Sequence, residues 1–262
     1  MLALPPQMEA HRAAFEATIK TFVKISVLPD VLPSPTQSRI GGTPYWKKGE
    51  AFPLDSEGTP LAFLAQINFA EVPAFENFPT DGILQFFIGT DDLYGMDFDD
   101  RFGASDFKAI YHPVPHATDN LETVFPTLSE AQLTPLNVSV VAITFELAQE
   151  LVPQSDYRFD KTFGEDFFEK QFKANEWDVA EAYGELHDSI GHKMGGYAFF
   201  TQWDIRDEKP EFAACDTLLL QIDTDNAAGT QWGDMGVANF FIRPEDLAAR
   251  DFSRVLYNWD CY

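Results

Sequence analysis

The sequence has little cysteine, few basic residues and no long apolar run, and each absence argues against a class of protein. Its two cysteines, Cys215 and Cys261, fit neither a zinc-ligand spacing nor a disulfide framework, which favours a reducing compartment. Only 18 lysines and arginines stand against 42 aspartates and glutamates. The resulting net charge of −24 disfavours nucleic acid and anionic membrane surfaces as partners. No run of about 18 apolar residues occurs, so no membrane-spanning segment is predicted.

Several motifs of catalysis and nucleotide binding are also missing. Neither a P-loop nor the glycine pattern of dinucleotide-binding folds occurs, and no serine lies in a nucleophile elbow. The first residues lack a basic segment followed by an apolar core, so they are unlike a signal peptide and a cytoplasmic location is expected. The sequence predicts no cofactor and leaves open whether the protein is an enzyme.

Phenylalanine, by contrast, is abundant, with 25 residues. Aromatic side chains bury large areas and favour strands, so the composition indicates a core rich in β-sheet. Apolar residues at helical spacing predict an N-terminal helix over residues 8–27, which the prolines from Pro29 to Pro35 end. The middle of the chain, residues 115–190, predicts a helical insert: two helices, near 128–131 and over 164–187, and a strand near 138–145.

Four sequence blocks recur in the same order, once over about residues 40–112 and again over about 192–261. The first set reads GGTPYW, LAFLAQINFAEV, GILQFFIGTDDL and DFKAIYH, and the second reads GGYAFFTQ, TLLLQIDTDNA, GVANFFIRPEDL and DFSRVLYN. Only the first set carries an acidic insertion, around YGMDFDDRFG. We interpret the pattern as an internal duplication. The blocks predict antiparallel strands, so we expect one domain over 1–262 that is mainly β with some α.

The same blocks resemble the YwqG-like family of bacterial proteins over nearly the whole chain, from Ile40 to Cys261. The blocks GGTPYW, PLAFLAQIN and GILQFFIG carry the resemblance in the first half, and HKMGGYAFFTQ, WGDMGVANFFI and DFSRVLYNWDC carry it in the second. The resemblance implies a mainly β fold with some helix and an internal repeat. It implies no activity, because that family is known as a domain of unknown function. An association of such proteins with bacterial toxin systems suggests an immunity or binding role.

Polar residues gather in the second set of blocks, and this group supplies the candidate site. The binding candidates are its members together with the equivalent glutamine of the first set: Gln66, His192, Gln221, Asp223, Trp232, Asp234, Asn239, Trp259 and Asp260. Asp223, Asp225 and Asp234 stand at the first, third and twelfth positions of a loop, as in an EF-hand, but the glycine required at the sixth position is Ala228. These three are the candidate metal ligands, and aspartates that cap turns in a solvated loop are the alternative.

Gln66 and Gln221 occupy equivalent places inside apolar strands. Each either bonds the backbone of the neighbouring glycine turn or lines a ligand cleft between the two sets of blocks. His192 is similarly open between a structural hydrogen bond and a catalytic role.

Two functions follow from these residues. The first is a non-catalytic binding protein whose acidic surface engages a basic protein partner. The second is a metal-assisted hydrolase in which Asp223, Asp225 and Asp234, with His192, hold a cation that activates water. A structural or assembly role is a third possibility, and the sequence does not predict the oligomeric state.

Overall fold

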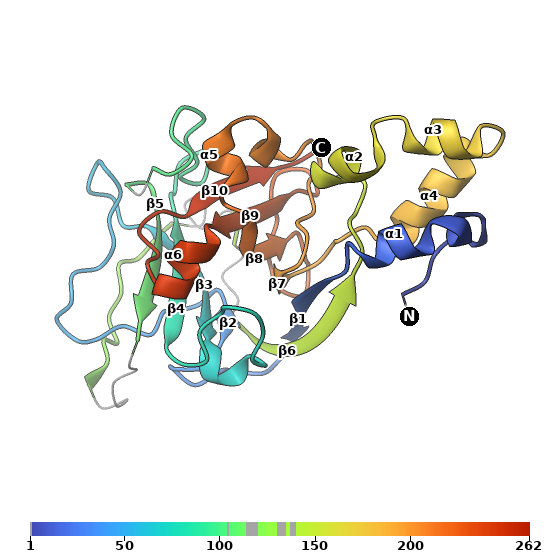
Figure 1. Cartoon of the computed structure of the whole chain (residues 1–262). Coiled ribbons are helices and arrows are strands. Elements are labelled where there is room, and N and C mark those ends of the chain that lie inside the picture. The colour runs from blue at the N-terminus through green and yellow to red at the C-terminus, as the bar shows by residue number, and fades with distance from the viewer. Residues whose placement is uncertain (1, 104, 114–119, 130–134, 137–139) are drawn as a thin grey trace.

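A computed structural model of the chain describes residues 2–103, 105–113, 120–129, 135–136 and 140–262. Its centre is one antiparallel sheet of ten strands (Figure 1). From one edge to the other they are β10 (Leu256–Asp260), β9 (Val237–Ile242), β8 (Thr217–Asp223), β7 (Lys193–Gly195), β1 (Lys20–Leu28), β6 (Val141–Glu150), β2 (Arg39–Ile40), β3 (Ala62–Asn68), β4 (Ile83–Ile88) and β5 (Phe107–His112). The mainly β, antiparallel fold expected from the sequence is therefore confirmed.

The sheet curls, so that strands near its two edges face each other across one core. The ring centroids of Phe86 on β4 and Phe240 on β9 lie 4.9 Å apart, and those of Phe107 on β5 and Tyr257 on β10 lie 5.0 Å apart. All four residues belong to, or pack within, the largest cluster of buried apolar side chains. Every residue of β4 and of β9 is buried. Apart from Gln85 and Asn239, these strands are apolar, as expected for strands whose two faces are both covered.

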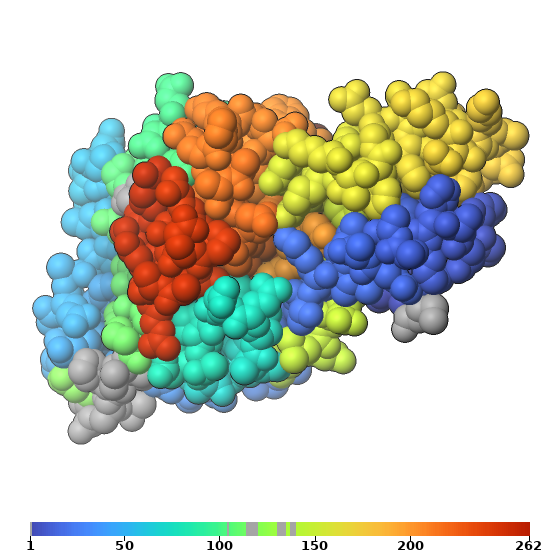
Figure 2. Space-filling view, viewed as in Figure 1, coloured from blue at the N-terminus to red at the C-terminus, as the bar shows by residue number. Residues whose placement is uncertain are grey.

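Short helices surround the sheet, and several form a separate lobe. The helices and turns are η1 (Pro6–His11), α1 (Arg12–Glu16), η2 (Phe69–Glu71), α2 (Arg158–Phe163), α3 (Phe167–Phe172), α4 (Glu176–Leu186), η5 (Ile205–Asp207), α5 (Pro210–Ala213) and α6 (Pro244–Ala249). The lobe that projects in Figure 2 contains α1, α3 and α4 and has its own aromatic core, which includes Phe15, Phe159 and Tyr183. Within the described residues, no helix has the length and apolar character needed to cross a membrane.

The strand order is symmetric about the central β1–β6 pair. On one side β7, β8, β9 and β10 follow in turn, and on the other side β2, β3, β4 and β5. The β3–β4 register shifts between Phe63 and Ala65, and the β8–β9 register shifts between Leu218 and Leu220. Strand β1 pairs with β6 along its whole length and also with β7, whereas β6 pairs with β2. Strands β7 to β10 therefore border β1, from the start of the chain, whereas β2 to β5 border β6, from its middle.

The prediction of one helix over residues 8–27 is wrong beyond its first half. Helix α1 ends at Glu16, and residues 20–28 form β1. Branched side chains occur at every second position of KTFVKISVL, with Val23 and Ile25 buried and Lys24 exposed between them, which is the period of a strand. Apolar Phe22 beside Val23 produced an apparent helical spacing.

The middle of the chain differs from its prediction in detail. The helix expected over 164–187 is two helices, α3 and α4, because Lys173 has a φ of 22° and ends α3. The strand expected near 138–145 is β6, whose described part starts at Val141, and 138–139 lie outside the described residues. In the helix expected near 128–131, residues 128 and 129 are not helical and the rest lies outside the described residues.

Candidate functional site

Gln66 and Gln221 are fully buried and hydrogen-bond to backbone in matching ways. Gln66 Oε1 accepts the N–H of Tyr45 at 2.8 Å, and its Nε2 donates to the carbonyls of Pro35 and Gln37 at 2.9 and 2.8 Å. Gln221 Oε1 accepts the N–H of Phe199 at 2.8 Å. Its Nε2 donates to the carbonyls of Ser189 and Gly191, at 3.0 and 2.7 Å. Both amides hold the backbone of neighbouring turns, and neither lines a described pocket.

Asn239 and its counterpart across the symmetric sheet, Gln85, extend this pattern. Asn239 pairs with Gln221 across β8 and β9, and its Nδ2 donates to the carbonyl of Phe199 at 2.8 Å. Gln85 pairs with Gln66 in the same way, and its Nε2 donates to the carbonyl of Tyr45 at 2.6 Å. These four amides serve the fold because each satisfies buried backbone groups.

His192 lies beside the loop that follows β8. Its Nδ1 accepts the N–H of Asp223 at 3.0 Å, so the ring proton is on Nε2, which lies 3.3 Å from a carboxylate oxygen of Asp225. Burial lowers the pKa of His192, although the two nearby carboxylates oppose this shift. The neutral imidazole thus joins β7 to the loop after β8, as expected for a structural histidine.

The three predicted metal ligands are not assembled into a site. Asp223 accepts the N–H groups of Gly191 and Thr224 at 2.7 and 2.8 Å, and Asp225 accepts that of Ala227 at 2.7 Å. Asp234 is exposed. Within the described part of the chain, no group of three or more His, Cys, Asp or Glu side chains is placed to hold a metal ion. The first two aspartates instead stabilise turns, because their oxygens are used by backbone N–H groups.

The last three candidates lie near one end of β10. Trp232 is fully buried and packs against Tyr94 and Trp259, with ring centroids 5.6 and 6.3 Å away. Trp259 donates its indole N–H to the carbonyl of Leu93 at 2.7 Å. Trp259 and Asp260 also line a pocket of about 160 Å³, and Trp232 forms part of the packing behind it.

We call this cavity the Arg101 pocket. Three segments line it: the β4–β5 connection, the segment around the start of η5, and the end of β10 with the residue after it. Its lining residues are Leu93, Met96, Phe98, Arg101, Gln202, Trp203, Ile205, Asn258, Trp259, Asp260 and Cys261. Most of these side chains are apolar, and the rings of Phe98 and Trp203 are 62% and 58% exposed at its rim. A concave apolar site with a few polar groups and exposed aromatic rings is typical of a ligand-binding pocket.

Arg101 is a buried cation that has no carboxylate partner in the described structure. It is 8% exposed, and no described carboxylate oxygen lies within the 4.0 Å limit of an ion pair. Its Nη1 donates to Asn258 Oδ1 at 2.9 Å and contacts the sulfur of Met96, while its guanidinium lies over the ring of Phe98 at 4.7 Å. Burial lowers the pKa of Arg101, although the more distant carboxylates of Glu208, Asp97 and Asp260 oppose this shift. An arginine nevertheless keeps its charge in proteins.

Two further polar groups of the pocket are incompletely bonded. Asn258 is 2% exposed, and its Nδ2 has no hydrogen-bond partner among the described residues. Asp260 is 9% exposed; its Oδ2 accepts the N–H of Gln202 at 3.0 Å, while Oδ1 has no such partner. Burial raises the pKa of Asp260, and contacts with Gln202 and Thr201 oppose this rise. The Thr201 hydroxyl itself completes no hydrogen bond within the described structure.

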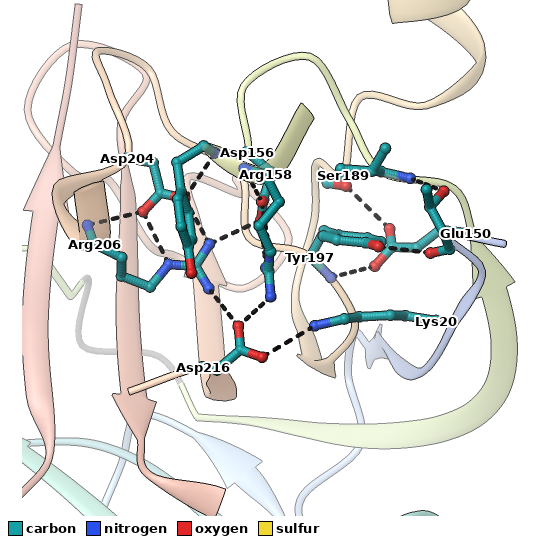
Figure 3. A network of polar contacts seen from close by, with 12 residues as sticks. Lys20, Glu150, Asp156, Arg158, Ser189, Tyr197, Asp204, Arg206 and Asp216 are labelled. Carbon is teal, nitrogen blue, oxygen red and sulfur yellow. Dashed lines mark hydrogen bonds and ion pairs between the residues drawn. The ribbon is translucent and has the colours of Figure 1, made fainter. Parts of the chain in front are cut away.

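A charged network fixes the segment that carries Trp203. Arg206 is buried and donates to Asp204 at 2.6 and 2.9 Å and to Asp156 at 2.9 Å (Figure 3). Arg158 also bonds Asp156 and reaches Asp216 (Figure 3). Asp204 directly follows Trp203, so this network holds the indole at the rim of the pocket. Its buried carboxylates are paired with arginines, which marks them as structural.

A second, more open pocket adjoins the first. We call it the acidic pocket: it has a volume of about 420 Å³, shares Gln202 and Trp203 with the Arg101 pocket, and is lined by carboxylates that include Asp160, Asp207 and Glu208. Trp203 donates its indole N–H to Glu208 at 2.7 Å. The two pockets therefore share one exposed tryptophan in their lining and differ in charge.

Of the residues that line this pocket, the sequence prediction names Trp259 and Asp260 but not Arg101, Trp203 or Phe98. Arg101 and Phe98 lie in the acidic insertion, whose like charges favoured a solvated face. The available signal was one arginine among carboxylates, at the place where the two sets of blocks differ in length.

Comparison with known proteins adds one match. A protein-family model described as "Domain of unknown function (DUF1963)" matches residues 38–261. No curated protein matches the chain. The matched range contains every residue that lines the Arg101 pocket.

Proposed function

The chain belongs to the family described as a domain of unknown function, DUF1963, and we propose that this member is a non-catalytic binding protein whose ligand site is the Arg101 pocket. The observation that carries the proposal is the buried guanidinium of Arg101, which faces the pocket without a carboxylate partner in the described structure.

Burying an arginine without a counter-ion is costly, because its charge loses contact with water. The neighbours of Arg101 are a neutral amide, a thioether and a phenyl ring, and none of them neutralises it. A ligand carboxylate or phosphate would supply the missing charge, and its two oxygens match the paired N–H groups of a guanidinium. The ligand is therefore a small molecule with an acidic group.

The pocket supports binding better than catalysis. Its lining contains no serine, threonine, lysine or histidine, so the usual pairs of nucleophile and base are missing from it. Its one thiol, on Cys261, has no histidine among the lining residues to act as its base. The hydrolase hypothesis is not carried further, because its metal ligands are not assembled in the described residues.

An internal duplication is part of this proposal. The symmetric strand order, the paired register shifts and the matching bonds of Gln66 and Gln221 support it. The acidic insertion breaks the symmetry, and it brings Arg101 to β10, where the N–H of Tyr257 donates to the Arg101 carbonyl at 3.1 Å. The pocket would then be a feature that one copy gained after duplication. An experimental structure in which residues 39–88 did not superpose on 193–242 would contradict the duplication.

The test of the binding site is the variant Arg101→Met, which keeps the length of the side chain and removes its charge. We expect it to melt at the wild-type temperature or higher, because a residue kept for binding is often destabilising. We also expect it to lose the thermal shift that small organic acids give the wild type. The control is Arg250→Met, at an exposed arginine that pairs with Asp81 at 3.3 Å. A loss of stability of more than about 2 kcal/mol in Arg101→Met would show a structural role.

A basic protein partner is a second candidate, favoured by the acidic pocket beside the exposed ring of Trp203. The net charge of −24 would accelerate association with such a partner, including a toxin-like protein of the kind that the resemblance suggests. Capture of partners from a lysate at low and at high salt tests it, with Trp203→Ala as the matched variant. A set of captured proteins that neither salt nor this substitution changes would refute it.

A further inference from the structure

We infer that the ligand of the Arg101 pocket is a small aromatic monocarboxylate, whose carboxylate binds the Nε and Nη2 groups of Arg101 and whose ring lies among the aromatic side chains of the lining. This inference rests on the proposed function and specifies its ligand. Three observations support it: the free edge of the guanidinium, the single positive charge of the lining, and the size and composition of the walls.

The guanidinium of Arg101 has one nitrogen in use and two that are free. Its Nη1 donates to Asn258 Oδ1 at 2.9 Å and contacts the sulfur of Met96. Nε and Nη2 donate no hydrogen bond within the described residues, and neither is among the polar side-chain atoms that are buried there without a partner. Both therefore keep contact with open space. Because Arg101 lines the pocket, that space is the cavity.

The free edge of Arg101 has the geometry that a carboxylate needs. The N–H bonds of Nε and Nη2 are parallel in the planar guanidinium, so the two oxygens of one carboxylate accept both at once. Asp260 leaves this edge free, because its Oδ2 accepts the N–H of Gln202 at 3.0 Å. The bond of Nη1 to Asn258, and that of the Arg101 carbonyl to the N–H of Tyr257 at 3.1 Å, hold the edge in place before a ligand binds.

The charge of the lining favours an acid with one negative charge. Arg101 is the one base among the described lining residues, and no serine, threonine or lysine there donates further hydrogen bonds. A phosphate group carries about −1.5 to −2 charges near pH 7 and three acceptor oxygens, so one guanidinium edge leaves it unmatched. The neighbouring acidic pocket and the net charge of −24 repel the second negative charge. A carboxylate avoids both penalties.

The walls of the pocket fit one aromatic ring. Its volume is about 160 Å³, and a cavity of roughly 150 Å³ is large enough to hold benzene. The rings of Phe98, Trp203 and Trp259 line it, together with the thioether of Met96. Aromatic rings pair favourably with one another and with sulfur. An aromatic ligand therefore gains contacts here that a saturated ring of the same size does not.

Trp203 is the lining residue that is best placed to pair with a ligand ring. Its side chain is 58% exposed at the rim of the pocket, and its indole N–H donates to Glu208 at 2.7 Å. The next residue, Asp204, is held by Arg206. The indole is thus fixed and still open to a ligand. An aromatic pair of this kind strengthens binding by about 2- to 10-fold beyond the area it buries.

The test is a calorimetric titration of the full chain with 3-phenylpropionate and four analogues. 3-Phenylpropionamide has the same shape without the charge, 3-cyclohexylpropionate has a saturated ring, acetate lacks the ring, and phenyl phosphate is a dianion. We expect 3-phenylpropionate to bind at least about 10-fold more tightly than the amide, because a hydrogen bond to a charged group contributes that much. It should bind about 2- to 10-fold more tightly than 3-cyclohexylpropionate, and more tightly than acetate or phenyl phosphate.

Three variants and a control accompany the titration. Arg101→Met should abolish the binding of 3-phenylpropionate. Arg101→Lys, which keeps the charge but not the two parallel N–H groups, should weaken it by about 10-fold. Trp203→Leu should weaken 3-phenylpropionate by about 2- to 10-fold and 3-cyclohexylpropionate by less. The control is Trp177→Leu, at a tryptophan of α4 that is 80% exposed and outside the pocket, and it should change neither.

The outcomes separate this inference from the proposed function. If 3-cyclohexylpropionate or phenyl phosphate binds as tightly as 3-phenylpropionate, and Arg101→Met still abolishes binding, the aromatic monocarboxylate is wrong and the anion-binding pocket stands. If the amide binds as tightly as the acid, or a folded Arg101→Met binds the acid as the wild type does, both are wrong. If Arg101→Met does not fold, Arg101→Lys decides, and binding as tight as that of the wild type overturns the inference. If no probe binds the wild type, the inference is wrong, and the thermal shifts with other organic acids decide the proposed function.

Discussion

Replacing Gln221 by leucine tests whether the buried glutamines hold the fold or line a ligand site. The change removes three hydrogen bonds, to the N–H of Phe199 and the carbonyls of Ser189 and Gly191. Each buried backbone group left unsatisfied costs roughly 1 to 3 kcal/mol. After the greater apolar burial of leucine offsets part of this, we expect the free energy of unfolding to fall by about 3 to 5 kcal/mol. For a domain of this size that lowers the melting temperature by roughly 10 °C.

The assay is urea unfolding followed by circular dichroism, with the midpoint and slope measured for each variant. Gln66→Leu should cost a similar amount, because Gln66 bonds one N–H and two carbonyls in the same way. The matched control is Gln149→Leu, at an exposed glutamine of β6, which should change stability by no more than about 0.5 kcal/mol. If Gln221→Leu and Gln66→Leu lay within about 1 kcal/mol of the wild type but lost ligand binding, the glutamines would line a site and the reasoning would be refuted.

Three further predictions concern the network, its pH dependence and the thiols. Arg206→Met should lower the free energy of unfolding by about 3 to 5 kcal/mol, because it removes an ion-pair partner from each of the buried carboxylates of Asp156 and Asp204. A loss of stability no larger than that of Arg250→Met would refute this prediction. Burial alone would raise the pKa of Asp156, but Arg158 and Arg206 lower it to about 2. A carboxyl group whose pKa is lower in the folded than in the unfolded protein stabilises the folded state at pH values above the unfolded pKa. The difference in free energy of unfolding between wild type and Asp156→Asn should therefore shrink as the pH falls from about 4 to about 2. A difference that stays constant over this range would contradict the prediction. Burial raises the pKa of the Cys215 thiol to about 11, so a thiol reagent at pH near 8 should modify Cys261 alone in the folded protein. Ligands of the Arg101 pocket should slow the modification of Cys261, because Cys261 lines that pocket. Equal labelling of both cysteines would disprove the burial of Cys215.

The strands of the repeated blocks were predictable because their signal is local. LLLQID and VANFFI combine branched or aromatic residues with flanking turn residues, and both became buried strands. The boundary between α1 and β1 was not predictable from spacing alone, because apolar residues over 15–23 satisfy a helical period and a strand period at once. Pairing with β6 and β7 decides between them, and that pairing is remote in sequence.

The candidate site was predicted in part for a similar reason. Trp259 and Asp260 stood out as a polar and aromatic group within a few positions of one another. Arg101 reaches the same pocket from a segment far away in the sequence, through its bond to Asn258. Local composition places Arg101 in a charged loop, and only the curl of the sheet, which brings the β4–β5 connection to β10, buries it.

The central strand pair has a consequence for the order of events during synthesis. Strand β1 leaves the ribosome early, but its partners β6 and β7 are made much later, and β2 also waits for β6. The first half of the nascent chain therefore holds an unpaired β1 until residue 150 has emerged, and the sheet stays incomplete until β7 to β10 follow. Contacts of such long range fold slowly and leave strand edges exposed meanwhile. Truncated or stalled chains that end before β6 should thus be recognised by chaperones and proteases as unfolded, whereas release of the full chain lets the sheet close in one cooperative step.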